Sequence, residues 1–259
     1  MKGVILAAGV SSRLRPLTDL TPKCLVELGG RTILGMTLEN LIVNGIARVV
    51  IVTGYREAQI RRFVRDAFPA LDVEFVRNDR FETTNNIYSL SLTESAVGED
   101  GIVLLDSDIV FDRRILGLLA RSGHDSCLAM KRGKVLGDEE IKVQVGPGGE
   151  ILRIGKEVPP GDAAGESIGI EKMSREFLRG LYRILGNMMT GDKNVNSFYE
   201  AAFQEAVTQG AAMAAVDVGE LQCIEIDTPE DLHAALSLSD LLQSHSRRQI
   251  PPRRAGSPA

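Results

Sequence analysis

Short apolar runs alternate with amphipathic stretches through the first half of the chain. Four runs of four or five residues are rich in β-branched side chains and are bounded by Gly, Asp or Asn, which favours buried strands over helices. They cover residues 4–8, 49–53, 73–76 and 102–105. Between them, residues 33–43 and 60–68 carry apolar side chains at helical spacing. This alternation predicts βαβ units and an α/β fold, with a Rossmann-like, mixed but mainly parallel sheet flanked by helices.

The second half of the chain has a different pattern, with short strand-like runs and glycine-rich turns such as 146–149. The three runs are residues 142–145, 151–154 and 167–171. We expect them to form a small antiparallel insertion that covers one side of a cleft. The further elements predicted from periodicity are helices over 178–189 and 198–207 and a late strand over 223–226.

The chain is predicted to close with a helix over residues 229–242 and a tail. Thr228 is suited to the N-cap of that helix, and Pro229 to its first position. Residues 244–259 are rich in Arg, Pro and Ser, and we expect them to be disordered. We therefore expect one domain over residues 1–243.

Composition excludes several classes of protein. The chain has 259 residues and a net charge of −5, which gives no general attraction to nucleic acid. No run of about 18 apolar residues occurs, so we expect no transmembrane helix and no membrane partner. Three scattered cysteines and three histidines argue against disulfides and against a histidine-rich metal site. We expect a cytoplasmic protein with reduced thiols.

The segment after the first predicted strand has the composition of a phosphate-binding loop. Gly9 and its small neighbours let backbone N–H groups approach an anion, and Arg13 offers a planar fork of donors. The loop then returns a cation, Lys23, towards the same place. The proposed phosphate-contacting residues are Leu6, Ala7, Ala8, Gly9, Ser11, Ser12, Arg13 and Lys23. The alternative is an ordinary tight turn with surface cations, and neither G-x-G-x-x-G nor the Walker pattern is present.

Two acids, Asp106 and Asp108, follow the apolar run 102–105. Residues two apart on a strand point to the same face, so both carboxylates could reach one cation. An acidic strand end that caps the next turn is the alternative. A strand end beside a phosphate loop is where Mg²⁺ would offset the charge of a transferred phosphoryl group. We therefore expect a magnesium site here.

The motifs LAAG (6–9), SRL (12–14), PLT (16–18) and PKCL (22–25) resemble the signature of the sugar-phosphate nucleotidyltransferase family. Enzymes of this family join a nucleoside monophosphate to a sugar phosphate or to phosphocholine, and the usual second glycine of the loop is replaced here by Ser11 or Ser12. The resemblance extends to about residue 236. It implies that Arg13 and Lys23 contact the triphosphate and that Asp108, rather than Asp106, binds the metal. It also implies that Asp227, in IEIDTPEDL (224–232), completes the metal site; a charge at the helix N-terminus is its alternative role.

The segment TNNIYSL (84–90) stands where sugar nucleotidyltransferases carry a Gly-Thr-Ala motif, and it resembles the phosphocholine cytidylyltransferase branch. Asparagine amides can both donate to and accept from the edge of a pyrimidine, so CTP is the favoured nucleotide. We expect Asn78, Thr84, Asn85 and Asp106 around the nucleotide. Helix capping by Thr84 or Asn85 is the alternative.

The same resemblance gives Lys156 the role of holding the acceptor's phosphate and places Glu166 beside the acceptor. Tyr199 and Glu200 could contact a cationic head group, with an exposed helix residue as the alternative for Glu200. The chain has no Trp and four Tyr, which argues against a rich aromatic cage for trimethylammonium. Phosphocholine, a phosphonate with an amine, an inositol phosphate and other small phosphorylated alcohols all stay open.

Together these features predict a magnesium-dependent cytidylyltransferase that uses CTP and a small phosphorylated or phosphonate acceptor. Residues 1–125 would form the nucleotide-binding half, and residues 126–243 the acceptor-binding half. A sugar-1-phosphate nucleotidyltransferase that uses another nucleoside triphosphate is the first alternative, and a non-catalytic nucleotide-binding regulatory protein is the second. The oligomeric state stays open, a homodimer included.

Overall fold

The computed structural model describes residues 1–133 and 136–248. Its central sheet places β1 (Lys2–Ala7) between β4 (Arg48–Thr53) and β6 (Ile102–Asp106). Both neighbours run parallel to β1, and β5 (Asp72–Arg77) continues the parallel order beyond β4. The predicted Rossmann-like arrangement is confirmed, and the four predicted strands lie side by side in the order β6-β1-β4-β5.

The predicted antiparallel strands are also confirmed, and they continue the same sheet beyond β6. β11 (Gly165–Met173) pairs antiparallel with β6, and with both β8 (Cys127–Lys131) and β9 (Lys142–Val145). β10 (Ile151–Gly155) completes that edge, while β12 (Ala214–Asp217) runs parallel to β8. The sheet is therefore mixed, with nine strands in all among the described residues. Two small antiparallel ribbons, β2–β3 (Glu27–Leu28 with Arg31–Thr32) and β7–β13 (Ile109–Phe111 with Cys223–Glu225), lie apart from it.

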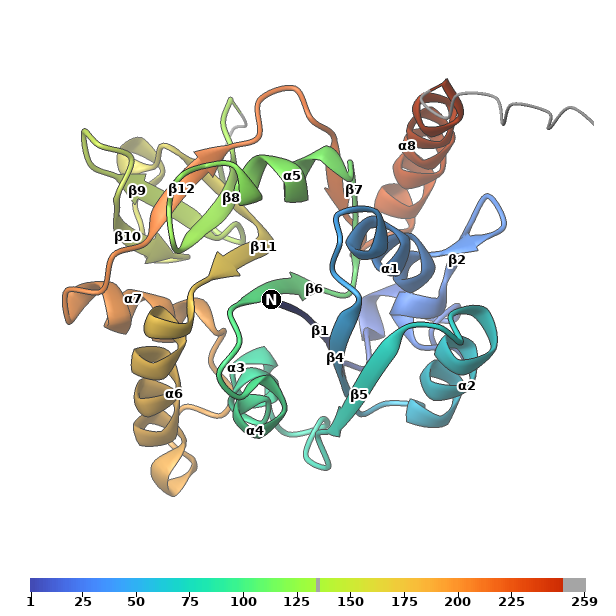
Figure 1. The fold of residues 1–259 in the computed structure, drawn as a ribbon, viewed down its shortest axis with the longest axis horizontal. Coiled ribbons are helices and arrows are strands. Elements are labelled where there is room, and N and C mark those ends of the chain that lie inside the picture. The colour runs from blue at the N-terminus through green and yellow to red at the C-terminus, as the bar shows by residue number, and fades with distance from the viewer. Residues whose placement is uncertain (134–135, 249–259) are drawn as a thin grey trace, which may run out of the picture.

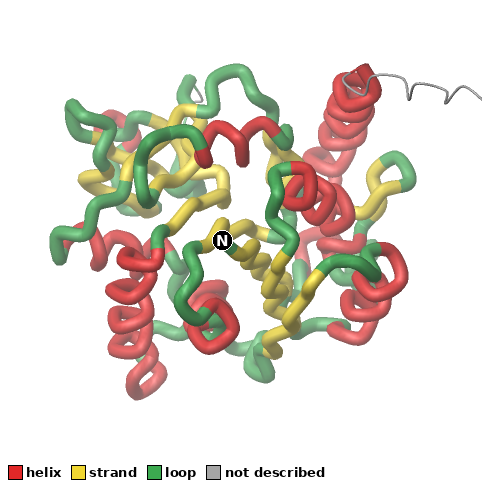
Figure 2. Tube along the Cα trace, viewed as in Figure 1, coloured by secondary structure: helices red, strands yellow, loops and turns green. Residues whose placement is uncertain are grey.

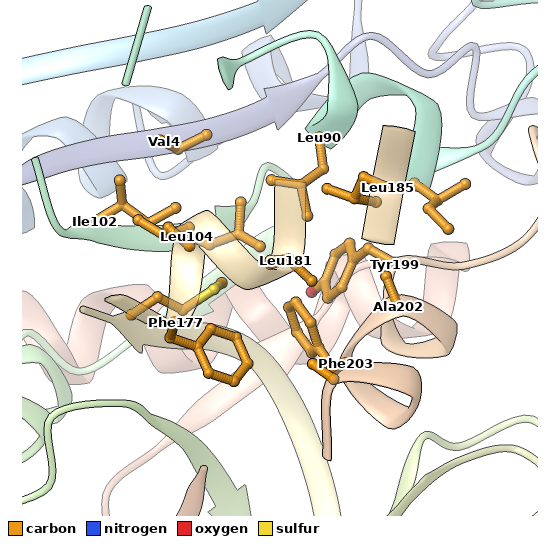
Figure 3. Close-up of a cluster of buried hydrophobic side chains, with 14 of the residues drawn as sticks. Val4, Leu90, Ile102, Leu104, Phe177, Leu181, Leu185, Tyr199, Ala202 and Phe203 are labelled. Carbon is orange, nitrogen blue, oxygen red and sulfur yellow. The ribbon is translucent and has the colours of Figure 1, made fainter. Parts of the chain in front are cut away.

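Helices cover both faces of the sheet (Figures 1 and 2). One face packs against α1 (Ile33–Val43), α2 (Glu57–Ala67) and α5 (Arg114–Ala120). The other packs against four helices, α3 (Asn86–Ser91), α4 (Glu94–Val97), α6 (Arg175–Met189) and α7 (Glu200–Thr208). Successive side chains of β1 point to opposite faces of the sheet, so Val4 and Leu6 belong to one core and Ile5 and Ala7 to the other. Figure 3 shows the core that contains Val4, a buried cluster to which Leu104 of the sheet and Leu181 and Phe203 of the helices belong.

The closing helix α8 (Pro229–Arg248) begins where the sequence predicts. The Thr228 hydroxyl accepts a hydrogen bond from the Asp231 backbone N–H at 3.2 Å, which confirms Thr228 as its N-cap. The helix continues six residues past its predicted end at 242, so the first five residues of the predicted disordered tail, 244–248, are helical. The rest of that tail, 249–259, lies outside the described residues. Among the described helices, none is both long and apolar enough to cross a bilayer.

Candidate active site

Parallel pairing brings the phosphate loop and the acidic strand end together. Leu6 on β1 pairs with Asp106 on β6, so the residues that follow both strands leave the same edge of the sheet. A cavity of about 190 Å³ opens there. Its lining includes Leu6, Ala7, Ala8, Gly9, Ser11, Lys23, Asn78, Thr84, Asn85, Asp106 and Asp108. Ser12 and Arg13 are the two expected nucleotide-contacting residues that are not part of this lining. Asn86 of the TNNIYSL motif also lines it, as do Phe81 and Ser89, which sequence reasoning did not assign to the site.

The loop is tied down at both ends by hydrogen bonds to its backbone. Ser11 adopts a left-handed conformation with φ 53°, and its carbonyl accepts from the Thr18 hydroxyl at 2.7 Å. The Tyr55 hydroxyl lies 2.7 Å from the Asp19 carbonyl, to which it can donate, and the Tyr55 N–H bonds to the Ala8 carbonyl. Gly54 permits this approach because a Cβ there would lie 2.8 Å from the Ala8 oxygen. The anchors fix the path of the loop over the cavity.

Lys23 lies between two carboxylates at the floor of this loop. Its Nζ is 2.8 Å from Asp108 Oδ2 and 2.7 Å from Asp227 Oδ1, and the residue is 6% exposed. Burial by itself lowers the pKa of Lys23, but its attraction to Asp108 and then to Asp227 outweighs burial, so the pKa is raised. Arg13, which is largely exposed, reaches Asp227 Oδ2 at 2.8 Å. Both predicted cations and both predicted metal-binding acids therefore meet at one place.

A third acid completes the cluster. Asp108, Glu225 and Asp227 each offer a carboxylate oxygen, and these oxygens lie within 4.8 Å of one another. The β7–β13 ribbon brings Glu225 opposite Ile109, and the Ile226 N–H bonds to the Asp108 carbonyl at 3.0 Å. Burial, followed by repulsion from Asp108 and Asp227, raises the pKa of Glu225 to about 7. A set of hard oxygen donors of this kind fits Mg²⁺.

Sequence reasoning missed Glu225, although a signal was present. Glu225 and Asp227 flank Ile226, which is fully buried, and residues two apart in an extended segment face the same way. The Asp227 backbone is fixed in turn by Asp231, whose Oδ2 accepts from the Asp227 and Thr228 N–H groups.

Asp106 belongs to a different group of side chains. Its Oδ2 accepts a hydrogen bond from the Tyr199 hydroxyl at 3.0 Å, and Glu171 lies on the other side of that hydroxyl at 3.5 Å. Burial, then repulsion from Asp108, raises the pKa of Asp106 well above its ordinary value, and burial followed by repulsion from Asp106 does the same for Glu171. Gly169, at φ +70°, is required beside this group because a Cβ would lie 2.5 Å from Asp106 Oδ2. Asp106 and Asp108 therefore have separate partners.

The predicted base-contacting amides line the cavity and also hold its wall in place. Asn78 is 1% exposed, and its amide donates to Thr84 Oγ1 and to Ser89 Oγ, both at 3.1 Å. Asn85 is the N-cap of α3, its Oδ1 accepting from the Asn86 N–H at 2.7 Å. Asn86 connects this wall to α7 because its Oδ1 accepts from the Tyr199 N–H. Asn85 therefore caps α3, as the alternative interpretation predicts, and it also lines the cavity.

The residues expected at the acceptor are only partly brought together. Lys156 Nζ lies 2.8 Å from Glu139 Oε2 and 4.7 Å from the centre of the Phe198 ring. Glu200 is 5% exposed, which makes the exposed-helix alternative wrong. Burial raises its pKa to about 7, against the opposing attraction of Lys156. Glu166 is half-buried on β11 opposite Lys131 and is not part of the cavity lining.

Tyr199 is oriented differently from the expectation. The residue is fully buried, and its ring packs against Phe203 with 5.1 Å between centroids (Figure 3). The ring face is therefore covered by the core, and the hydroxyl is the part that reaches Asp106. A contact between that ring and a cationic head group is not available in this arrangement.

The site lies at the carboxyl edge of a mixed Rossmann-like sheet and combines a phosphate-type loop, a buried lysine and several acids. This combination defines the nucleotidyltransferase class. The family model of the MobA-like NTP transferase domain matches residues 3–204, and the chain belongs to this family.

Two curated relatives and one solved structure illustrate the similarity. CMP-5'-(3-aminopropyl)phosphonate synthase of Streptomyces rubellomurinus is 28% identical over 91% of this chain and 38% of its own length. Choline-phosphate cytidylyltransferase of Streptococcus pneumoniae is 34% identical over 41% of this chain and 45% of its own length. The chain thus matches less than half the length of either relative. The solved CTP:phosphocholine cytidylyltransferase from Streptococcus pneumoniae superposes with a TM-score of 0.77 at 20% identity, covering 92% of this chain and 98% of that one.

Proposed function

We propose that this protein is a magnesium-dependent cytidylyltransferase, which transfers CMP from CTP to a small phosphorylated or phosphonate acceptor and releases pyrophosphate. The observation that carries the proposal is the position of Lys23 between Asp108 and Asp227, at a cavity bordered by the phosphate loop. A site of this kind combines cations for phosphate oxygens with carboxylates for a metal ion.

The reaction is an in-line displacement. An ionised acceptor oxygen forms a bond to the α-phosphorus of CTP, and the bond from that phosphorus to the bridging oxygen breaks, so its electron pair leaves with pyrophosphate. A phosphate acceptor is already largely ionised near pH 7, so the step requires no general base. Arg13 and Lys23 orient and offset the charge of the triphosphate. Lys156 is assigned to the acceptor's phosphate or phosphonate group.

Mg²⁺ would be held by Asp108 and Asp227, with Glu225 as a third candidate ligand. When bound, it would withdraw charge from the phosphate oxygens. The protein's own contribution is the rigid placement of those ligands: the Ile226 N–H bonds to the Asp108 carbonyl, and Asp231 holds the Asp227 backbone.

The choice of CTP is supported by the Asn85 and Asn86 amides at the cavity, and by the printed names of the two curated relatives, which are CMP- or CTP-related. An acceptor with a positively charged amine is favoured by the surplus of acids, since Glu200 is buried near Asp106 and Glu225 belongs to the acid cluster of the proposed site. Both relatives' names also include a nitrogen-bearing acceptor. We place this activity in the cytoplasm, in keeping with three free cysteines.

Pyrophosphate release across CTP, UTP, ATP and GTP tests the proposal. Each nucleotide would be paired with phosphocholine, 2-aminoethylphosphonate, inositol 1-phosphate and glucose 1-phosphate in the presence of Mg²⁺. We expect CTP with an amine-bearing acceptor to give the highest kcat/KM. A preference for glucose 1-phosphate with another nucleotide would establish the sugar nucleotidyltransferase alternative. Nucleotide binding without pyrophosphate release in any pairing would establish the regulatory alternative.

A further inference from the structure

The metal-binding carboxylates already have a cation of the protein's own between them. Lys23 Nζ contacts both Asp108 and Asp227, and Arg13 contacts the second oxygen of Asp227. Lys23 begins the short helical turn Lys23–Leu25, whose next residue, Cys24, is buried, so its backbone has a fixed position. A divalent ion that binds Asp108 and Asp227 would therefore compete with the Lys23 ammonium for the same carboxylate oxygens.

The charges of the cluster are nearly balanced by the protein itself. Lys23 and Arg13 supply two positive charges against the three carboxyl groups of Asp108, Asp227 and Glu225, so the cluster has at most one uncompensated negative charge. Adding a divalent ion to this group would leave an excess of positive charge beside Lys23, which is 6% exposed, and that is costly. A polyanionic triphosphate removes the excess, because it offers Lys23 and Arg13 new partners of the type that they bind well.

We propose that Lys23 is the resident counter-ion of Asp108 and Asp227 and thereby makes metal binding conditional on the nucleotide. The triphosphate draws Lys23 away from the carboxylates, and the divalent ion takes its place there. This inference rests on the proposed nucleotidyl-transfer site, and it adds an order of events: the free protein discriminates against a lone divalent ion, and the metal enters with the triphosphate. Lys23 thus has two roles in turn, first at the carboxylates and then at the phosphates.

The variant Lys23→Met tests this idea because methionine keeps most of the side-chain length and removes the charge. Mn²⁺ binding without nucleotide would be followed from the electron paramagnetic resonance signal of the free ion. Binding of Mg·CTP without acceptor would be followed by calorimetry. We expect Lys23→Met to bind Mn²⁺ alone roughly tenfold or more tightly than the wild type, since a nearby like charge is gone. We expect the same variant to bind Mg·CTP more weakly, since a phosphate contact is lost.

Opposite changes in the two affinities separate this role from a purely structural one, which would lower both. Lys156→Met is the matched control: it removes an equal charge from the acceptor side, where Lys156 pairs with Glu139, and should leave Mn²⁺ binding unchanged. The double variant Lys23→Met/Asp108→Asn should lose the gain in Mn²⁺ affinity. If Lys23→Met fails to fold by circular dichroism, Lys23→Gln takes its place.

Tight Mn²⁺ binding by the wild type without nucleotide would overturn the inference, as would a folded charge-removing variant that gains no Mn²⁺ affinity. Persistence of the gain in the double variant would overturn it too, because the ion would then be bound elsewhere. The Mn²⁺ measurements need neither CTP nor an acceptor. A lack of cytidylyl transfer would therefore contradict the proposed function without changing the Mn²⁺-binding result.

Discussion

The Tyr199 hydroxyl donates to Asp106 at 3.0 Å and thereby joins the start of α7 to the end of β6, across 93 positions of sequence. Glu171 Oε1 lies 3.5 Å from the same hydroxyl, but one O–H can serve only one acceptor well. The shorter distance indicates that the Tyr199 hydroxyl proton points to Asp106. Within the described part of the chain, the second oxygen of Glu171 has no hydrogen-bond partner. The group is thus a buried polar network that supports one wall of the cavity.

Tyr199→Phe should weaken both the fold and the reaction. The ring packing against Phe203 is kept, but buried Asp106 loses its donor, which costs about 1–3 kcal/mol of unfolding free energy. The carboxylate can then turn within the cavity, so pyrophosphate release should fall as well. Urea denaturation and initial rates would measure the two effects.

Tyr182→Phe is the matched control for that variant. The Tyr182 hydroxyl makes a comparable buried hydrogen bond, to Thr93 Oγ1 at 2.8 Å, away from the cavity lining. It should reduce stability by a similar amount and leave the rate per folded molecule unchanged. Equal losses of activity in both variants would contradict a specific role for Tyr199.

Glu171→Gln should change how stability depends on pH. Because burial and then repulsion from Asp106 raise the pKa of Glu171 well above 4.5, the folded state binds a proton that the unfolded state has released. The corresponding stability is present below the unfolded pKa near 4.5 and is lost as pH rises towards the folded pKa. Glutamine mimics the protonated acid, so the variant should lose less stability as the pH rises above 4.5.

Urea denaturation at several pH values would measure that difference. Glu176→Gln, an exposed change in the first turn of α6, is the control and should reproduce the wild-type profile. A profile of Glu171→Gln parallel to that of the wild type would show that Glu171 ionises in the folded protein as freely as in the unfolded chain.

Gly169→Ala should be destabilising for two reasons. The residue has φ +70°, which strains any side chain, and its new Cβ would lie 2.5 Å from Asp106 Oδ2. We expect a loss of about 1–3 kcal/mol together with reduced activity. Gly180→Ala within α6 is the control, since nothing lies within 4 Å of its Cβ, and a helical glycine replaced by alanine gains up to about 1 kcal/mol. Thermal denaturation would compare them, and equal melting temperatures would contradict the assigned strain.

The parts of the site that follow from local patterns were predictable from the sequence. β-Branched runs with clear boundaries predicted the strands, and parallel strands end at a common edge, so Gly9 and Asp108 were expected at the same edge of the sheet. The cap at Thr228 depends only on adjacent residues, and the structure has it where the sequence indicates. In each case, a short stretch of chain contains all the information.

Contacts between distant segments were not predictable in this way. The separation of Asp106 from Asp108 depends on Tyr199 and Glu171, which come from α7 and β11, and no local pattern gives the packing of those elements. The burial of Glu200 has the same origin, since a charged residue at the start of a helix is usually solvated. Glu225 is an intermediate case: its alternation with Asp227 was visible, but the pairing of β13 with β7 that brings it to Asp108 was not.

Asp108→Asn addresses the reaction most directly. Asparagine keeps the shape of the side chain but removes one of the charges that Lys23 and a divalent ion would both use. We expect pyrophosphate release to fall about 100-fold or more, because metal-assisted neutralisation is worth several kcal/mol and each 1.4 kcal/mol is a factor of ten. Asp112→Asn is the control four residues away, because Asp112 is 5% exposed and pairs with Arg114 at 2.6 Å. It should reduce the free energy of unfolding by about 1–3 kcal/mol without reducing the rate per folded molecule. Near-normal turnover by Asp108→Asn, or an equal rate loss in Asp112→Asn, would show that the carboxylate of Asp108 is not what the transfer requires.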